Sequence, residues 1–230
     1  MKIAFLSFYS GVVYRGVETY VHELASKLSE RGHEVGVYQN GPPVYGGRYR
    51  TVSIGLRFKS FENGNLAVLL NQIIGTYTDF RFTLKVLKGI DKDVDFIIAT
   101  GNRLQALLVR LWCLTKKCKL IIPGQSGPGI DERFALWCFP DVFIPLSQYQ
   151  KSWAHRANPF VKISEVIHNG TSLQSFYKLR KKIDFGLKGK IVLCTATLWP
   201  IMKRQDLLIK AISRLKNTSL LLAGEGQSKE

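Results

Sequence analysis

Two adjacent cations, Lys203 and Arg204, offer the clearest chemistry in this sequence. An apolar run ends at Leu193, a short loop follows, and a segment with helical spacing of apolar residues begins at or just after the cations. Backbone N–H groups and the helix dipole favour negative charge at a helix N-terminus. Lysine adds a compact positive charge there, and arginine adds a planar fork of donors. This pattern predicts a site for a phosphate-type anion, although a plain surface Lys-Arg pair at a helix start reads the same way.

The composition is that of a globular protein with an excess of positive charge. Of the 230 residues, 46% are hydrophobic and 22% are charged. Residues 1–150 hold 18 basic and 12 acidic side chains, and residues 151–230 hold 15 basic and 5 acidic ones. The surplus is therefore concentrated in the last third. Such a field attracts polyanions, whether nucleotide phosphates, anionic lipid headgroups or nucleic acid.

Short apolar runs alternate with amphipathic segments along most of the chain. We expect strands at residues 3–8, 35–38, 51–56, 95–100, 119–123, 142–146 and 164–167. We expect helices at residues 17–31, 66–88, 103–115, 132–139 and 148–157, the second with a weak point at Gly75. This alternation predicts an α/β fold with a doubly wound, Rossmann-like parallel sheet.

The same pattern restarts near the end of the chain. Residues 1–168 form the first expected domain, and the polar, basic and aperiodic residues 169–189 form an expected linker. Residues 190–230 then show a strand at 191–193, a helix at 204–215 and a strand at 219–223. A domain usually needs roughly 100 residues or more. We therefore expect an incomplete second domain, truncated at its C-terminal side.

The first loop does not match the known phosphate-binding fingerprints. Gly11 and Gly16 have the spacing of a P-loop, but Val17 and Glu18 stand where Lys and Ser or Thr are required. The dinucleotide fingerprint G-x-G-x-x-G is absent as well. The two glycines still predict a tight turn at a helix N-terminus. That turn would lie at the carboxyl edge of the sheet, where open α/β folds bind ligands.

No metal site is predicted. The four cysteines lack C-x-x-C spacing and clustered histidines. Asp91, Asp93 and Asp95 resemble an acidic cluster, but they directly precede an expected strand, where solvated turn charges are the better interpretation. Free cysteines suit a reducing compartment, and neither a signal peptide nor a run of membrane-spanning length is present. We expect a cytoplasmic protein.

Four segments jointly resemble the family 4 retaining glycosyltransferases, the GT-B relatives of glycogen synthase and of bacterial mannosyl- and rhamnosyltransferases. They are residues 15–35, 166–176, 196–211 and 220–226. The resemblance implies a GT-B fold whose second domain holds most of a nucleotide-diphosphate sugar. It also implies a glycan or lipid-linked acceptor on the first domain. No cofactor or metal is then expected, because cations and helix N-termini neutralise the leaving diphosphate.

The resemblance also assigns roles to residues of this chain. Lys203 matches the diphosphate lysine of the family and Arg204 occupies the next place, so both are expected to be catalytic. The expected donor-binding residues are Gly16, Thr197, Gly224, Glu225 and Gly226. The expected acceptor-side residues are Arg15, Glu18, Asn102, Ser126, Asp131 and Glu132, with N-cap residues as the alternative reading of the last two. The expected interdomain residues are Asn169 and Gly170.

The chain departs from the family pattern at several positions. Arg15 stands where the first loop glycine is usual, and Thr197 stands where many members carry an arginine. Near Asn102 many members place a histidine. The paired-glutamate motif, which contacts the donor sugar and ribose, is absent. We therefore expect this fragment to be inactive by itself.

The function implied is that of a retaining hexosyltransferase in cell-surface polysaccharide or glycan synthesis. The alternative is a truncated, non-catalytic remnant or a lone acceptor-binding domain. The basic surplus would suit an anionic membrane surface, with the protein peripheral at the inner face. Nucleic acid is not an expected partner, because the only basic stretch with an aromatic residue, residues 177–182, reads as a solvated linker.

Overall fold

The chain folds as two compact units in a computed structural model. The structure describes residues 1–57, 65–101, 103–171, 184–198, 203–224 and 226, and within residues 65–72 it describes the helix but not the side chains. Unit 1 comprises Met1–Ser172 and unit 2 comprises Leu173–Glu230. Each unit is described by itself below.

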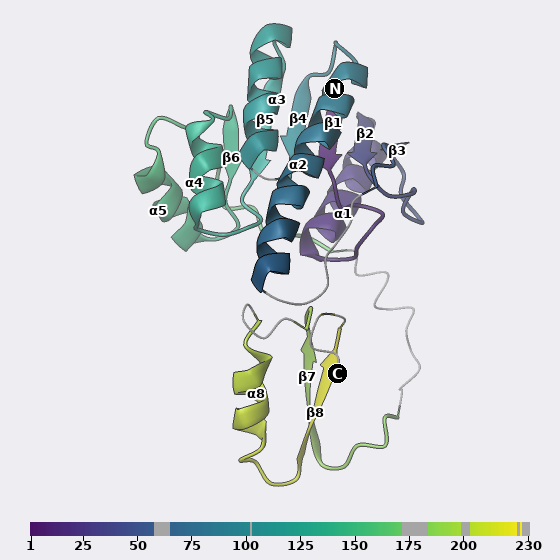
Figure 1. The fold of residues 1–230 in the computed structure, drawn as a ribbon, viewed down its shortest axis with the longest axis vertical. Coiled ribbons are helices and arrows are strands. Elements are labelled where there is room, and N and C mark those ends of the chain that lie inside the picture. The colour runs from purple at the N-terminus through teal and green to yellow at the C-terminus, as the bar shows by residue number, and fades with distance from the viewer. Residues whose placement is uncertain (58–64, 102, 172–183, 199–202, 225, 227–230) are drawn as a thin grey trace. The chain divides into compact units, whose positions relative to one another are not determined.

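Unit 1 is built on a parallel sheet (Figure 1). Its strands are β1 (Lys2–Ser7), β2 (Glu34–Gln39), β3 (Arg50–Ser53), β4 (Phe96–Ala99), β5 (Lys119–Pro123) and β6 (Val142–Ile144). Their order is β3-β2-β1-β4-β5-β6, and every neighbouring pair is parallel. This confirms the predicted α/β fold. Because the strands share one direction, all of their carboxyl ends meet at one edge of the sheet.

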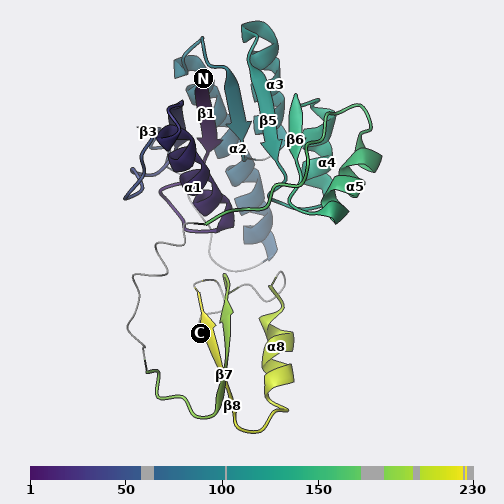
Figure 2. The same cartoon turned by 180° about the vertical axis from the view of Figure 1, so that it is seen from behind.

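Helices cover the two faces of this sheet unequally (Figures 1 and 2). On one face α1 (Gly16–Glu30) packs Val21 and Ala25 against Phe5 and Val37. The other face is covered by α2 (Asn65–Gly89), α3 (Arg103–Lys116), α4 (Ile130–Trp137) and α5 (Gln148–Ala157). These four helices contribute buried residues to one core cluster with the sheet. Each of these helices therefore buries one side against the sheet, while apolar residues of α3 and α4 such as Leu111 and Trp137 stay exposed.

The structure corrects three local expectations. The segment at 164–167 is not a strand, because only Ile163 forms an isolated bridge, with Phe143. Helix α2 runs without interruption through Gly75, since packing on the sheet and on α3 outweighs the weak helix propensity of glycine. Gly16 lies inside the first turn of α1 without a positive φ, so it is not the residue that turns the chain.

The turn after β1 depends instead on Gly11. Its φ is +74°, and a Cβ at this position would overlap with the carbonyl oxygen of Pro42. A Cβ on Gly41 would in turn overlap with the backbone of Gly11. The loops that follow β1 and β2 are therefore in direct backbone contact at the carboxyl edge.

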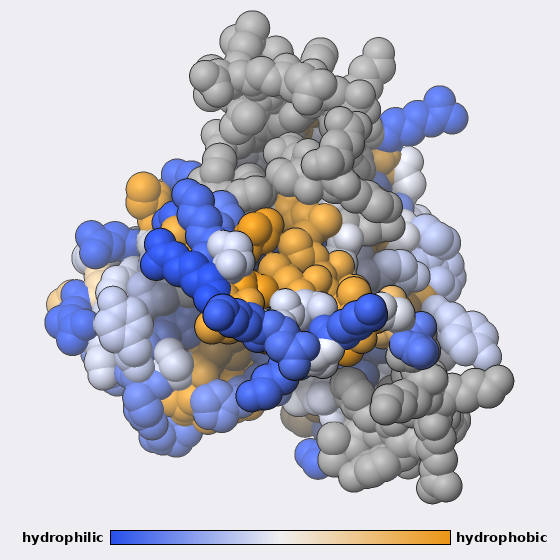
Figure 3. Space-filling view, turned by 90° about the horizontal axis from the view of Figure 1, so that it is seen from below, coloured by the Kyte–Doolittle hydropathy of each residue, from blue (hydrophilic) through white to orange (hydrophobic). Residues whose placement is uncertain are grey.

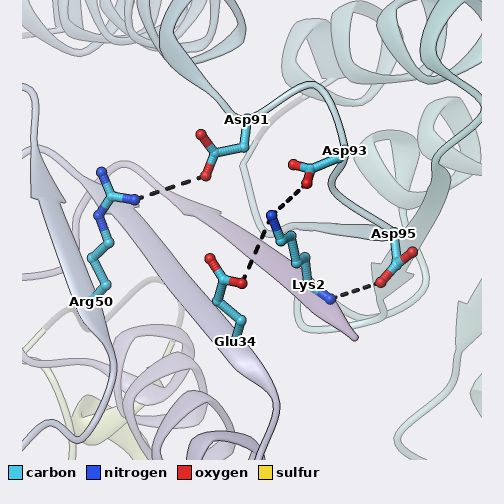
Figure 4. A network of polar contacts seen from close by, with 6 residues as sticks. All are labelled: Lys2, Glu34, Arg50, Asp91, Asp93 and Asp95. Atoms are coloured by element: carbon cyan, nitrogen blue, oxygen red, sulfur yellow. Dashed lines mark hydrogen bonds and ion pairs between the residues drawn. The ribbon is translucent and has the colours of Figure 1, made fainter.

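The opposite, amino edge of the sheet holds a network of ion pairs (Figure 4). The backbone N–H of Lys2 donates to Asp95 at 2.7 Å, and the Lys2 ammonium pairs with Asp93. Arg50 and Asp91 lie 3.8 Å apart. Asp91 and Asp93 therefore pair with cations of β3 and β1, and Asp95 accepts from the backbone of β1, all at the amino edge of the sheet.

The described residues of unit 2 form a β-α-β element. It contains β7 (Lys190–Thr195) and β8 (Thr218–Ala223), which pair in parallel, and α8 (Gln205–Ile212) between them. This arrangement covers only part of its apolar surface, and several apolar side chains are at least half exposed: Ile191, Leu193, Leu207 and Ile209. Figure 3 shows hydrophobic residues exposed on the face seen from below, with hydrophilic residues along part of their border.

We expect Gly11→Ala to destabilise the protein by about 1–3 kcal/mol, because it adds both a steric overlap and a strained φ. Urea unfolding measures this loss. Gly16→Ala is the matched control, since nothing lies within 4 Å of the position its Cβ would take. Equal stabilities of the two variants would contradict the proposed contact between the loops.

The ion pair of Lys2 and Asp93 predicts a pH dependence. Its hydrogen bond lowers the pKa of Asp93 below 3.8 and raises the pKa of Lys2 above 10.5. The stabilisation is then present between these two values, and it is lost as the pH falls through the lowered pKa of Asp93. The free energies of unfolding of the wild type and Asp93→Asn should therefore differ at pH 7 and converge near pH 2. For Glu23→Gln, a control at a residue without an ion pair in the described part of the chain, we expect no such convergence.

Candidate functional site

The N-terminus of α1 brings a charged pair to the carboxyl edge of unit 1. The Arg15 guanidinium lies 4.7 Å from the centre of the Tyr9 ring and donates to Glu18 Oε1 at 3.0 Å. Glu18 is only 7% exposed, and its Oε2 has no hydrogen-bond partner among the residues that the structure describes. Open space surrounds the Cα of Gly16 on the side where a Cβ would point. This corner therefore offers an accessible helix N-terminus next to a buried carboxylate oxygen without a donor.

Glu132 shapes the loop that follows β5. Its side chain is buried, and Oε1 accepts hydrogen bonds from the backbone N–H groups of Ser126 at 3.0 Å and Gly127 at 2.8 Å. Oε2 accepts from the Gln150 side chain at 2.8 Å. Burial raises the pKa of Glu132, and these hydrogen bonds oppose that shift. Glu132 is not the capping residue of α4, because Gly129 is its N-cap. Glu132 is not an exposed polar group either, because its side chain is buried.

The other residues predicted for the acceptor side and the interdomain segment are exposed. Asp131 pairs with Arg103 at 2.6 Å, and Ser126 lies at the surface of the same loop. Asn169 exchanges two amide hydrogen bonds with Gln125, at 2.9 and 3.1 Å. The structure therefore brings the loop after β5 together with the segment at Asn169. Asn102 and Glu225 lie outside the described residues.

In unit 2 a buried glutamine holds the loop between β7 and α8. Gln205 is 4% exposed and donates to the carbonyl oxygen of Thr197 at 2.8 Å, while its Oε1 has no partner. The N-cap of α8 is Arg204, whose φ of 53° is left-handed, and its guanidinium bonds Asp206 at 3.2 and 3.3 Å. Lys203 is exposed and has no ion-pair partner among the residues described. The two predicted catalytic cations thus differ, since only Arg204 is already paired.

Gly224 and Gly226, which follow β8, lie in close backbone contact with this loop. A Cβ on Gly224 would overlap with the carbonyl oxygen of Ala196, and one on Gly226 would overlap with that of Leu198. Thr197 lies between these two contact points. The structure therefore gathers Thr197, Gly224 and Gly226 at the carboxyl edge of the small sheet. It also adds Gln205, which the sequence reasoning missed because nothing in the local pattern marks it as buried.

A hollow of about 480 Å³ lies on the α1 face of unit 1. Tyr20 and Leu24 of α1 and Ile98, Ile121 and Ile144 of the sheet line it, together with residues 167, 168, 170 and 171. The predicted interdomain residue Gly170 is thus part of this lining. The walls are mostly apolar, and Glu23, Lys27, His168 and Thr171 are the polar residues among them.

Two kinds of feature are absent from the described part of the chain. Within it no three His, Cys, Asp or Glu residues are grouped so that they could hold a metal ion. None of the helices described there is long and apolar enough to cross a membrane.

We expect Glu132→Gln to destabilise the protein by about 1–3 kcal/mol, because buried polar groups lose their partners. A glutamine at 132 would turn an NH₂ group toward the Gln150 amide nitrogen. Gln150 cannot rotate to accept it, because Gln150 also donates to Gly124 and accepts from the N–H of Leu146. Thermal and urea unfolding measure the loss. Asp131→Asn, at the exposed neighbour, should change stability by less than about 1 kcal/mol, and equal losses in the two variants would contradict this assignment.

The fold is shared with known nucleotide-sugar enzymes. A sucrose-phosphate synthase from Thermosynechococcus elongatus superposes with a TM-score of 0.69 at 16% identity, over 99% of this chain and 63% of that one. Anabaena HepE in complex with UDP gives 0.61 at 17%, over 99% and 62%. WaaG, a glycosyltransferase involved in lipopolysaccharide biosynthesis, gives 0.57 at 14%, over 98% and 64%. A UDP-N-acetylglucosamine 2-epimerase also matches, with a TM-score of 0.52 at 10% identity.

These comparisons establish architecture and no more. No model of a protein family matches the chain, and no curated protein matches it in sequence. The chain spans 62 to 64% of the three structures first named. At these identities the shared property is the fold. Unit 1 has the Rossmann-like sheet, and the short second sheet follows it, as in GT-B structures.

Proposed function

We propose that this chain belongs to a retaining glycosyltransferase that uses a nucleotide-diphosphate sugar. In this proposal unit 1 holds a glycan or lipid-linked acceptor, and the loops of unit 2 hold the donor diphosphate. The product would serve cell-surface glycan synthesis. The structural relative WaaG is a glycosyltransferase involved in lipopolysaccharide biosynthesis. No metal is required, because protein cations balance the charge of the leaving group.

The observation that carries the proposal is the arrangement at the start of α8. Lys203 is exposed and without an ion-pair partner in the described part of unit 2, beside a helix N-terminus. Backbone N–H groups and an ammonium together suit a diphosphate. The left-handed Arg204 costs about 1–2 kcal/mol, and such strain is concentrated at ligand sites. The close packing of Gly224 on Ala196 holds the neighbouring loop in place.

The acceptor side of the proposal is supported by the carboxyl edge of unit 1. Sugar hydroxyls donate and accept hydrogen bonds, so they need carboxylate, hydroxyl or amide groups in a preformed loop. Glu18 offers an oxygen without a donor, and Arg15 holds its other oxygen in place. Ser126 is exposed in a loop that Glu132 fixes from beneath, and Asp131 is exposed in the first turn of α4, where it pairs with Arg103. Glu132 is thereby a positioning residue in this proposal.

Epimerisation of a nucleotide sugar is the second candidate, since an epimerase shares the fold. Both reactions begin with the same diphosphate contact. They differ in whether a second substrate accepts the sugar. The predicted contact at Lys203 is thus common to both, and the acceptor corner at Glu18 belongs to transfer alone.

We expect the chain to bind UDP, GDP or ADP more tightly than the corresponding monophosphate. Lys203→Ala should raise the dissociation constant for the preferred diphosphate by about tenfold or more, since a charge-assisted hydrogen bond contributes about 1.5–3 kcal/mol. The same variant should bind the monophosphate nearly as the wild type does. Isothermal titration calorimetry at fixed ionic strength measures these constants. The ligands are the three diphosphates and the monophosphate of whichever diphosphate binds most tightly.

The control is Lys210→Ala, which removes an equal charge from the last turn of the same helix. We expect it to leave nucleotide affinity within about twofold of the wild type, because it lowers the net positive charge without removing a contact at the helix N-terminus. An equal weakening by both variants would mean that Lys203 acts through net charge alone. Unchanged diphosphate affinity in Lys203→Ala would refute the assignment.

A further inference from the structure

Two buried thiols lie together where α3 leads into β5. Cys113 is in the last turn of α3, Cys118 immediately precedes β5, and their exposed fractions are 1% and 6%. Both belong to the same core cluster of unit 1, and a side-chain hydrogen bond joins their thiols. A single buried cysteine behaves as a small apolar residue. A hydrogen-bonded pair can in addition exchange electrons by forming a sulfur–sulfur bond.

The turn at the end of α3 brings the pair together. Lys117 stands between the helix and Cys118, and its φ of 58° is left-handed. A left-handed residue just past a helix C-terminus ends the helix and redirects the chain. Only four residues separate the two cysteines in the sequence. Closing so short a loop costs little chain entropy, so the turn keeps the two sulfurs within reach of each other.

The shared hydrogen bond makes the two thiols unequal. It lowers the pKa of Cys118, because a hydrogen bond donated by the Cys113 thiol stabilises the Cys118 thiolate. The same hydrogen bond raises the pKa of Cys113, and burial adds to that rise. Arg110 favours the Cys118 thiolate, whereas burial and Asp141 oppose it. Since the thiolate is the nucleophilic form of cysteine, Cys118 is the sulfur that reacts first.

The surroundings of Cys118 give a small oxidant a route to it. Residues 114–117 and Lys119 are exposed, so the Cys118 side chain is covered within an otherwise exposed turn. Helix ends and loops are the parts of a fold that open at the lowest free energy. Cys138 belongs to the same core cluster, but burial raises its pKa and it therefore carries less thiolate. Oxidation is thereby directed to Cys118.

We propose that Cys113 and Cys118 form a peroxide-reactive site that closes into a reversible disulfide. The Cys118 thiolate attacks one oxygen of hydrogen peroxide. A sulfur–oxygen bond forms, the oxygen–oxygen bond breaks, and the hydroxide that leaves takes up a proton to give water. The Cys113 thiol then attacks the sulfenic sulfur of Cys118, and the hydroxyl group leaves with the Cys113 proton as a second water. Each sulfur loses one electron, and the peroxide gains two.

The disulfide keeps the oxidation reversible. Cys113 removes the sulfenic acid before a second peroxide converts it to a sulfinic acid, which thiols do not reduce. The pair lies at the amino edge of the sheet, because Cys118 precedes β5, whereas the loop proposed for the acceptor follows β5 at the carboxyl edge. The modification is therefore independent of the proposed transferase function.

The test is peptide mapping of the full chain after treatment with hydrogen peroxide and alkylation of the remaining thiols. Trypsin cleaves after the two lysines between the cysteines, so the two peptides separate unless a disulfide joins them. We expect the joined peptide, lighter by two hydrogen atoms than the two reduced peptides together. It should form about tenfold faster than any disulfide that includes Cys138 or Cys194. Dithiothreitol should restore both thiols.

Two variants separate the roles of the two sulfurs. In Cys113→Ser we expect Cys118 to stop at the sulfenic acid, which dimedone traps. In Cys118→Ser we expect the oxidation of Cys113 to be about tenfold slower, because burial opposes its ionisation. The matched control is Cys194→Ser, which removes a thiol from unit 2 and should leave the disulfide unchanged. Circular dichroism verifies that each variant is folded.

Several results would overturn the proposal. They are the absence of the joined peptide in the wild type, oxidation of Cys138 or Cys194 as fast as that of Cys118, and a sulfinic acid that dithiothreitol does not reduce. A dimer on a non-reducing gel would also contradict it, since the disulfide then joins two copies of the chain. Because nucleotide affinity is not measured here, failure of this proposal leaves the Lys203 assignment unaffected, and the converse also holds.

Discussion

Unit 1 depends on the parallel pairing of β1 with β2 on one side and with β4 on the other. Parallel strands have to be covered on both faces, and each crossover between them needs a helix or a long connection. The pairing therefore sends every loop after a strand to the same edge, where the loops after β1, β2 and β5 converge. The pairing also leaves part of one face of the sheet without a covering helix among the described residues. Only α1 packs on its face among the helices described, so β4 to β6 border an apolar hollow.

Three buried polar side chains hold loops in place in this protein. Glu132 and Gln150 together fix the loop after β5, and Gln205 fixes the loop before α8. A buried hydrogen bond is costly to break, because the partner left behind loses its solvation. These contacts therefore keep the exposed groups nearby, such as Ser126 and Lys203, on rigid supports. That rigidity is what a site for a charged, polar substrate requires.

The positive charge of the chain is divided between paired and unpaired cations. Lys2, Arg103 and Arg204 each face a carboxylate and contribute to local structure. Lys203 and the cations at the end of α3 have no such partner in the described residues. Unpaired cations are the ones available to outside anions, so the distribution of partners is more informative than the net charge.

The amino-acid sequence by itself determined the α/β class and most of the strands and helices, because periodicity and turn residues are local. Strand β5 and helix α5 begin and end where the pattern predicted. The predicted site residues stay predictions. Only the tertiary structure decided that Gly11 rather than Gly16 makes the turn, that Glu132 is buried, that Gln205 holds a loop, and that 164–167 forms no strand. Each of these depends on segments far apart in the chain coming into contact, and no local pattern encodes which atoms will meet.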